Sequence, residues 1–166
     1  MKQEEYWKIL DKTNDWIKFS DTKAVVILTF YGIIITAIYS NSNEVYAFLS
    51  GSIFSISIAI IAVLLSITSV LFSFLSINPR LRNLNPHSIL YFGHIQENYS
   101  NYTDYFEHSR DVISNDTEYE KQIAEQIYVN SKIAWKKFKN ITYSLRCFFL
   151  SILSIFLLMI HYFINQ

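Results

Sequence analysis

The stretch of sequence that decides the fold is VYAFLSGSIFSISIAIIAVLLSITSVLFSFLSI, residues 45–77. Its 33 residues include no aspartate, glutamate, lysine or arginine, and Asn78-Pro79 follows directly. About 20 apolar residues in a helix cross roughly 30 Å of hydrocarbon. The stretch therefore predicts a transmembrane helix longer than one straight crossing needs, which either tilts or projects at one end into the headgroups.

Two more stretches lack these charged residues: residues 24–40, with 17 residues, and residues 147–166, with 20. A signal peptide is the alternative for the first, but its lead carries five acids as well as five lysines, and no small-residue cleavage site follows. We therefore expect an all-α integral membrane protein with three transmembrane helices and helical cytoplasmic extensions that form a small bundle. The expected division is a cytoplasmic amphipathic helix at 1–23, membrane spans at 24–40, 45–77 and 143–164, and a cytoplasmic helical region, the expected sensor, at 78–142.

The distribution of basic residues predicts the orientation, because loops rich in lysine and arginine stay in the cytoplasm. The short turn from Asn41 to Glu44, between the first two spans, has no basic residue. The N-terminus and the region between the second and third spans are therefore expected in the cytoplasm, and the C-terminus outside. The basic residues that precede the first span are Lys2, Lys8, Lys12, Lys18 and Lys23, and those that flank the central region are Arg80, Arg82, Lys132, Lys136, Lys137, Lys139 and Arg146.

Helical periodicity continues outside the spans. Residues 4–23 carry a face at spacings of three and four that leads into the first span, and Thr117 to Glu120 match a capping box that opens a helix of about 45 residues ending in the third span. Tyr99, Tyr102, Phe106 and Ile113 indicate a short amphipathic helix in the segment 78–115, which is expected to pack beside the two extensions. The residues at these spacings in 4–23 are Trp7, Leu10, Asn14, Ile17 and Asp21, four of which would make one face, and the last helix has Ile123, Ile127, Ala134, Phe138 and Ile141.

Small residues form a seam along the second span, at spacings of three and four that keep them on one face of a helix. The third span repeats the pattern with Ser144, Cys147, Ser151 and Ser154, and the first span has a weaker version in Thr29, Gly32, Thr36 and Ser40. Two interpretations stay open: the seam packs the three helices of one protomer, or it also mediates oligomer contacts or lines a hydroxylated pore after activation. The seam consists of Ser52, Ser55, Ala59, Ala62, Ser66, Ser69, Ser73 and Ser76.

The composition argues against catalysis and ion-coupled transport. No ionisable side chain lies deep in a span, three glycines leave no phosphate-binding loop, and the formal net charge is zero, so we expect no nucleic-acid partner. The four histidines have no metal-binding spacing, and Cys147 is the single cysteine. We therefore expect no enzyme, no cofactor and no metal. Asp21 and Lys23, just before the first span, either mark the membrane boundary, pair with the inserted segment or bind a ligand.

The entry to the first span, DWIKFSDTKA at residues 15–24, resembles the W-I-x-x-x-D-x-K-A entry of the transmembrane effectors of bacterial pyrimidine-cyclase antiphage (Pycsar) systems. Asn85-Pro86 followed by ILYFGHI at residues 89–95 is similar to a short apolar, aromatic and glycine motif of that family. Residues 122–139 resemble the family's amphipathic helix before its last span. The resemblance thus covers nearly the entire chain.

This resemblance implies an antiphage effector of the bacterial inner membrane. It responds to a cyclic pyrimidine mononucleotide, cCMP or cUMP, that a partner cyclase makes, and it then impairs the membrane and causes abortive infection. The implied partners are the lipid bilayer, the nucleotide and further copies of the chain in a homo-oligomer. The alternative is an ungated membrane assembly, scaffold or lysis-type protein with no nucleotide ligand.

A cyclic mononucleotide needs cations or backbone amides for its phosphate and flat rings for its base. The chain offers both kinds of side chain near the predicted membrane face. Membrane topology and interfacial anchoring alone also explain basic and aromatic residues there. The ligand-binding candidates are Arg80, Arg82, Tyr91, Tyr99, Tyr102, Trp135, Lys136 and Lys137.

Overall fold

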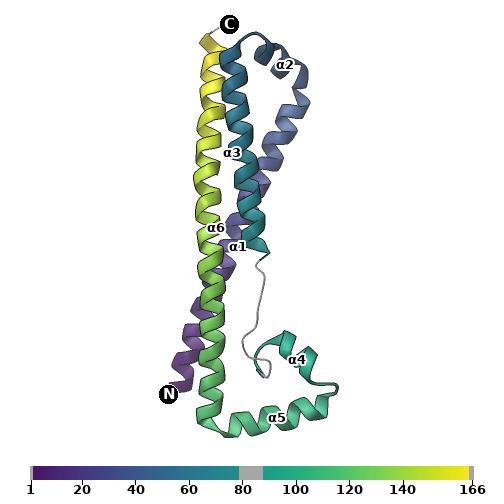
Figure 1. The fold of residues 1–166 in the computed structure, drawn as a ribbon, viewed down its shortest axis with the longest axis vertical. Helices are drawn as coiled ribbons and strands as arrows, with labels where there is room; N and C mark the ends of the chain where they lie inside the picture. The colour runs from purple at the N-terminus through teal and green to yellow at the C-terminus, as the bar shows by residue number, and fades with distance from the viewer. Residues whose placement is uncertain (1, 79–87, 165–166) are drawn as a thin grey trace. The chain divides into compact units, whose positions relative to one another are not determined.

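The computed structural model describes residues 2–78 and 88–164 (Figure 1). These residues form six α-helices and no strand. The helices are α1 (Lys2–Ser40), α2 (Ser42–Ser50), α3 (Ile53–Ile77), α4 (Phe92–Asn98), α5 (Tyr102–Ser114) and α6 (Asp116–Ile164).

Three helices, α1, α3 and α6, are long and apolar enough to cross a membrane. The prediction of an all-α membrane protein with three transmembrane helices is therefore confirmed. Both α1, with 39 residues, and α6, with 49, begin in a hydrophilic segment and continue without a break into an apolar one. Arg80 and Arg82 lie outside the described residues.

The chain divides into two compact units. The first, which we call the insert unit, comprises Met1–Phe19 and Pro79–Lys136. The second, the span unit, comprises Ser20–Asn78 and Lys137–Gln166. Since α1 and α6 each begin in the insert unit and end in the span unit, two continuous helices belong to both.

The uncharged stretch 45–77 is not one helix. It is interrupted at Gly51 and Ser52, where Ser52 has the extended backbone conformation of an N-cap residue (φ −153°, ψ 128°), so that α2 is a separate short helix. The remaining 25 residues of α3 span about 37 Å, which crosses the hydrocarbon with little excess. The helix ends before Pro79, whose ring disfavours the helical conformation in the residue before it.

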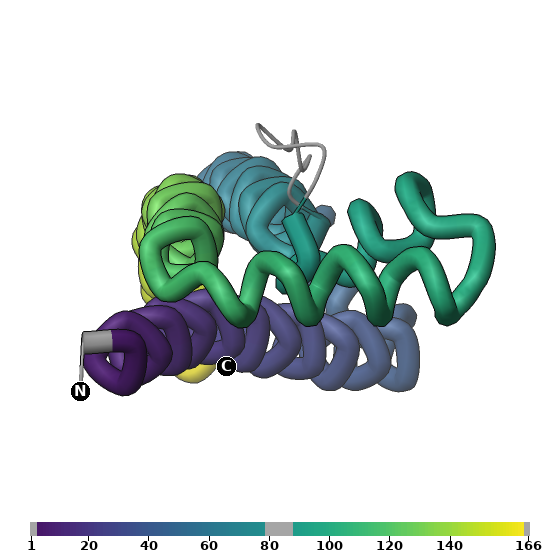
Figure 2. Tube along the Cα trace, turned by 90° about the horizontal axis from the view of Figure 1, so that it is seen from below, coloured from purple at the N-terminus to yellow at the C-terminus, as the bar shows by residue number. Residues whose placement is uncertain are grey.

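Within the span unit, α3 and the second half of α6 lie side by side (Figures 1 and 2). The apolar core lies between α1 and α6 and consists of Ala24, Ile27, Tyr31 and Ile141. The last turns of α1 diverge from α3 (Figure 1). Among residues 32–40, Ile34 alone is half-buried. The small residues Thr29, Gly32, Thr36 and Ser40 are all exposed, so they do not pack the first span against the other two.

The insert unit comprises α4, α5 and the first parts of α1 and α6, and α4 lies alongside α5 in both views (Figures 1 and 2). Ile89, Val112 and Ile123 are its most buried apolar residues besides Leu10. The Asn101 side chain caps α5 by accepting a hydrogen bond from the Asp104 N–H at 2.9 Å.

Two local predictions in the insert unit are corrected. The side-chain cap of α6 is Asn115, whose Oδ1 accepts a hydrogen bond from Glu118 N at 3.3 Å, and not the predicted Thr117. The helix α5 exists, but Tyr102, Phe106 and Ile113 are exposed. Its inner face consists of the buried Ser109 and Val112 and the half-buried Tyr105 instead.

Candidate functional site

Buried serines join α3 to α6 in the span unit. The Ser144 hydroxyl lies 3.1 Å from that of Ser69 and 2.7 Å from that of Ser73, and all three side chains are fully buried. Ser69 Oγ also lies 2.9 Å from the Ser144 carbonyl oxygen, and Ser144 Oγ 2.8 Å from that of Ser69. Small side chains let the two backbones approach closely enough for these contacts.

The predicted seam of the second span faces inward along most of its length. Ser55, Ala62, Ser69, Ser73 and Ser76 are buried. The other three members, Ser52, Ala59 and Ser66, are half-buried. On α6 the matching positions Ser144 and Ser151 are buried, while Cys147 and Ser154 are half-buried. The structure thus brings the seams of α3 and α6 together.

An ion pair ties α1 to α6 at the start of the span unit. Lys137 Nζ of α6 lies 2.5 Å from Asp21 Oδ1 of α1. The lysine side chain is 5% exposed, while that of the aspartate is 38% exposed. Among the side chains that the structure describes, Lys137 is the one buried residue of the aspartate, glutamate, lysine and arginine types.

The same turn of α6 also contacts α3. Ser76 Oγ donates a hydrogen bond to the Lys137 carbonyl oxygen at 3.3 Å, and Asn140 Nδ2 donates one to the Leu75 carbonyl oxygen at 3.1 Å. One helical turn, from Lys137 to Asn140, therefore contacts both other spans through polar groups.

A second polar contact between α1 and α6 lies deeper in the span unit. The Tyr31 hydroxyl lies 3.0 Å from that of Ser151, and both residues are buried. Tyr31 also meets Phe148 edge to face, with ring centroids 5.4 Å apart. Sequence reasoning missed Tyr31, although its spacing of seven residues from Ala24 places both on one face of α1.

The inserted segment is held to α6 by buried polar groups. Ile89 N donates a hydrogen bond to the Gln122 side-chain oxygen at 3.0 Å, and Tyr105 OH donates one to the Ile89 carbonyl oxygen at 3.3 Å. His94, 4% exposed, accepts a hydrogen bond at Nδ1 from Ser88 N at 3.3 Å. These contacts satisfy backbone N–H and carbonyl groups of residues 88 and 89, which lie outside the helices. Sequence periodicity gave no signal for them.

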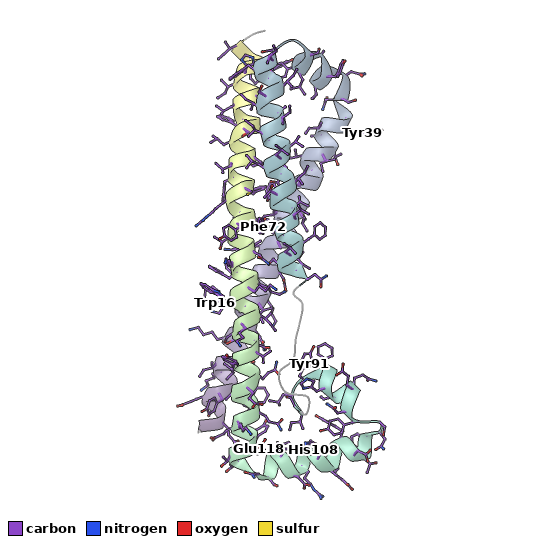
Figure 3. The ribbon with its side chains drawn as sticks, in the orientation of Figure 1. Trp16, Tyr39, Phe72, Tyr91, His108 and Glu118 are labelled. Carbon is purple, nitrogen blue, oxygen red and sulfur yellow. The ribbon has the colours of Figure 1, made fainter. Side chains whose placement is uncertain are left out.

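Two of the aromatic candidates lie in clusters on this segment. Tyr91 packs against Phe92 and His94, with ring centroids 4.8 and 5.2 Å apart, and Figure 3 shows it at the start of α4. Tyr99 contacts Tyr105 and His108, with centroids 5.3 and 5.8 Å away. Burial, together with the neighbouring Tyr105 phenol, raises the pKa of Tyr99 above its usual value.

The other candidates lie apart from these clusters. Tyr102 is exposed and stacks on Phe106 at 5.8 Å. Trp135, 70% exposed, and Lys136 are exposed neighbours on α6. Lys137 follows Lys136 directly but is buried against Asp21.

The comparisons with known proteins give one match. A family model described as PycTM: Pycsar effector protein domain matches residues 5–164. No curated protein and no solved structure matches the chain. The family match covers every helix described above almost completely.

Proposed function

Since the chain belongs to the Pycsar effector family, we propose that it detects a cyclic pyrimidine mononucleotide, cCMP or cUMP, from a partner cyclase and then impairs the inner membrane. Infected cells would die before the phage matures. The chain would act with further copies in a homo-oligomer, with the insert unit in the cytoplasm and the C-terminus outside.

One observation carries this proposal: α1 and α6 each run from a hydrophilic segment into an apolar span without a break. An α-helix is stiff over such lengths unless proline, glycine or an inserted side chain interrupts it. A ligand that shifts the first half of either helix therefore shifts the second half as well. Binding outside the hydrocarbon is thereby converted into a change among the spans.

The proposed ligand contacts are cations for the phosphate and aromatic rings for the pyrimidine. Trp135 and Lys136 are accessible as they stand, because both are exposed next to each other on α6. Tyr102 is exposed on α5, whereas Tyr91 and Tyr99 are half-buried among other rings and would have to turn. Arg80 and Arg82 belong to the same proposal from the sequence.

The small-residue seam of α3 is the proposed surface through which the spans exchange partners. Its serines bond to Ser144 in the protomer, but small side chains impose little steric selectivity, so a similar face of another copy fits as well. Contact with further copies would then extend the damage beyond one protomer.

The test is nucleotide-dependent leakage. The full chain is reconstituted into phosphatidylethanolamine and phosphatidylglycerol vesicles that contain a self-quenching dye, and cCMP, cUMP, cAMP or cGMP is added. We expect release with one of the cyclic pyrimidines and not with the purines, and binding of the same nucleotide by calorimetry.

Variants at the accessible pair refine the test. Trp135→Ala and Lys136→Gln should each weaken binding of the active nucleotide about tenfold, as expected for the loss of one stacking or charged contact. Lys121→Gln is the matched control, because this exposed lysine on the same helix pairs with Glu118. Failure of both cyclic pyrimidines to bind or to release dye would refute the proposed ligand.

A further inference from the structure

The three spans are joined by buried polar groups. Between α3 and α6, Ser69, Ser73 and Ser144 form a connected cluster of fully buried hydroxyls. Asn140 adds a side-chain hydrogen bond to α3 one turn earlier on α6. These contacts extend over more than one turn of both helices, so α3 and α6 form the firmly joined pair.

The helix α1 packs on α6 through a short buried face. Its buried face in the span unit consists of Ser20, Ala24, Ile27 and Tyr31, after which residues 32–40 are exposed apart from the half-buried Ile34. Polar contacts between α1 and α6 in this unit include the Asp21–Lys137 pair and the Tyr31–Ser151 hydrogen bond.

Polar contacts are part of what holds helices together in a bilayer. Lipid tails are as apolar as leucine or isoleucine, so burial of Ala24 and Ile27 against α6 gives no hydrophobic driving force of the usual kind. The association of α1 with α6 then depends on van der Waals packing and on its polar contacts. The Asp21–Lys137 pair joins two full charges.

Lys137 also connects all three spans. Its ammonium group contacts Asp21 of α1, while its backbone carbonyl accepts the hydrogen bond from Ser76 of α3. A buried ammonium that loses its carboxylate must move to water or find another anion, because a buried unpaired charge is unfavourable. Asp21 is already 38% exposed, so it is the partner that water reaches first.

We propose that the Asp21–Lys137 pair is a latch that holds α1 on the α3–α6 pair in the resting state, and that opening it releases α1 and starts membrane impairment. This inference rests on the proposed effector function and names α1 as the span that moves. The latch requires opposite charges at positions 21 and 137, whichever of the two carries the negative charge.

The test is a charge swap in the vesicle assay, performed without nucleotide. Asp21→Lys and Lys137→Asp each place like charges together and should raise the basal rate of dye release about tenfold. The reason is that the ion pair stabilises the closed state, in which α1 lies on the α3–α6 pair, and its loss raises the population of the open state by the same factor. The double variant, Asp21→Lys with Lys137→Asp, restores opposite charges and should return the basal rate to that of the unchanged chain.

The matched controls are Asp15→Lys on α1 and Lys139→Asp on α6, both exposed positions. They change the net charge in the same way and should leave the basal rate unchanged. Helix content by circular dichroism and elution as a single species are measured for every variant, so that only folded variants are compared.

Two outcomes would overturn the latch: folded single variants no leakier than the controls, or a double variant as leaky as the single ones. The nucleotide response of the unchanged chain is a separate arm. Leaky single variants and a tight double variant in a chain that ignores nucleotides would keep the latch and refute the proposed ligand.

Discussion

At the scale of single residues, hydroxyl groups decide how closely the spans approach. The hydroxyl of a serine on a helix in lipid forms a hydrogen bond either to a carbonyl oxygen of its own helix or to a group on a neighbouring helix. Ser66 bonds within its own helix, donating to the Ala62 carbonyl oxygen at 2.8 Å. Ser69 and Ser144 bond to each other across the two helices. Such contacts average about 0.6 kcal/mol each in membrane proteins, so several together are needed to hold a pair of spans.

Tyr99 offers a prediction about pH. Its pKa is raised first by burial and then by the nearby Tyr105, both of which disfavour the phenolate in the folded chain. A group with a raised folded-state pKa contributes stability that is present below its unfolded pKa, about 10, and is lost as the pH rises through the folded pKa. Tyr105→Phe should therefore lower the pKa of Tyr99 part of the way towards its usual value.

The measurement is NMR of the chain labelled at tyrosine Cζ, with the Tyr99 signal assigned from Tyr99→Phe. Tyr102→Phe is the control, because Tyr102 is exposed and stacks on Phe106 instead. An unchanged Tyr99 pKa in Tyr105→Phe would mean that burial alone raises it.

At the scale of helices, sequence periodicity predicted what depends on local pattern. The continuity of α6 follows from polar and apolar residues that recur at three and four along its whole length. Lys137 belongs to that inner face through its spacing of three from Ala134 and four from Ile141, a signal that it is buried. The identity of its partner, Asp21, depends on tertiary packing and could not be read from the sequence.

The missed features have physical causes. The break between α2 and α3 lies inside a run without charge, and Gly51 keeps an ordinary right-handed conformation (φ −77°, ψ −16°), so neither hydropathy nor turn chemistry marked it. The inner face of α5 was misjudged because Ser109 is buried while Phe106 is exposed. In the candidate site, Gln122 and His94 bind loop backbone groups, and such contacts have no periodicity.

The continuity of α6 leads to a second prediction. Lys139 is exposed on this helix, between the proposed contacts Trp135 and Lys136 and the apolar part of α6, and proline there removes a backbone hydrogen bond and clashes with the preceding turn, at a cost of about 3 kcal/mol. Lys139→Pro should keep nucleotide binding but lose nucleotide-dependent dye release. Lys139→Ala, which preserves the helix, should behave as the unchanged chain does. A proline variant that binds and releases dye at full rate would show that α6 does not transmit the signal.

At the scale of the whole molecule, three membrane crossings put the two ends of the chain on opposite sides of the bilayer. The distribution of positive charge predicts which side is which: five lysines precede the apolar part of α1, and none lies between α1 and α3. The proposed function requires the insert unit on the side where the nucleotide is made. Orientation and function are therefore linked.

The last prediction tests that link. A fluorescent protein that folds only in the cytoplasm and a phosphatase that is active only outside it are each fused at two places, after Gln166 and after Ser100. Ser100 is an exposed residue between α4 and α5, so an insertion there interrupts no helix. We expect phosphatase activity alone after Gln166 and fluorescence alone after Ser100. Because each place receives both reporters, every fusion that should be silent is checked by one that should give a signal. Phosphatase activity after Ser100 would place the insert unit outside, beyond the reach of a cytoplasmic nucleotide, and would refute the orientation and the proposed sensing together.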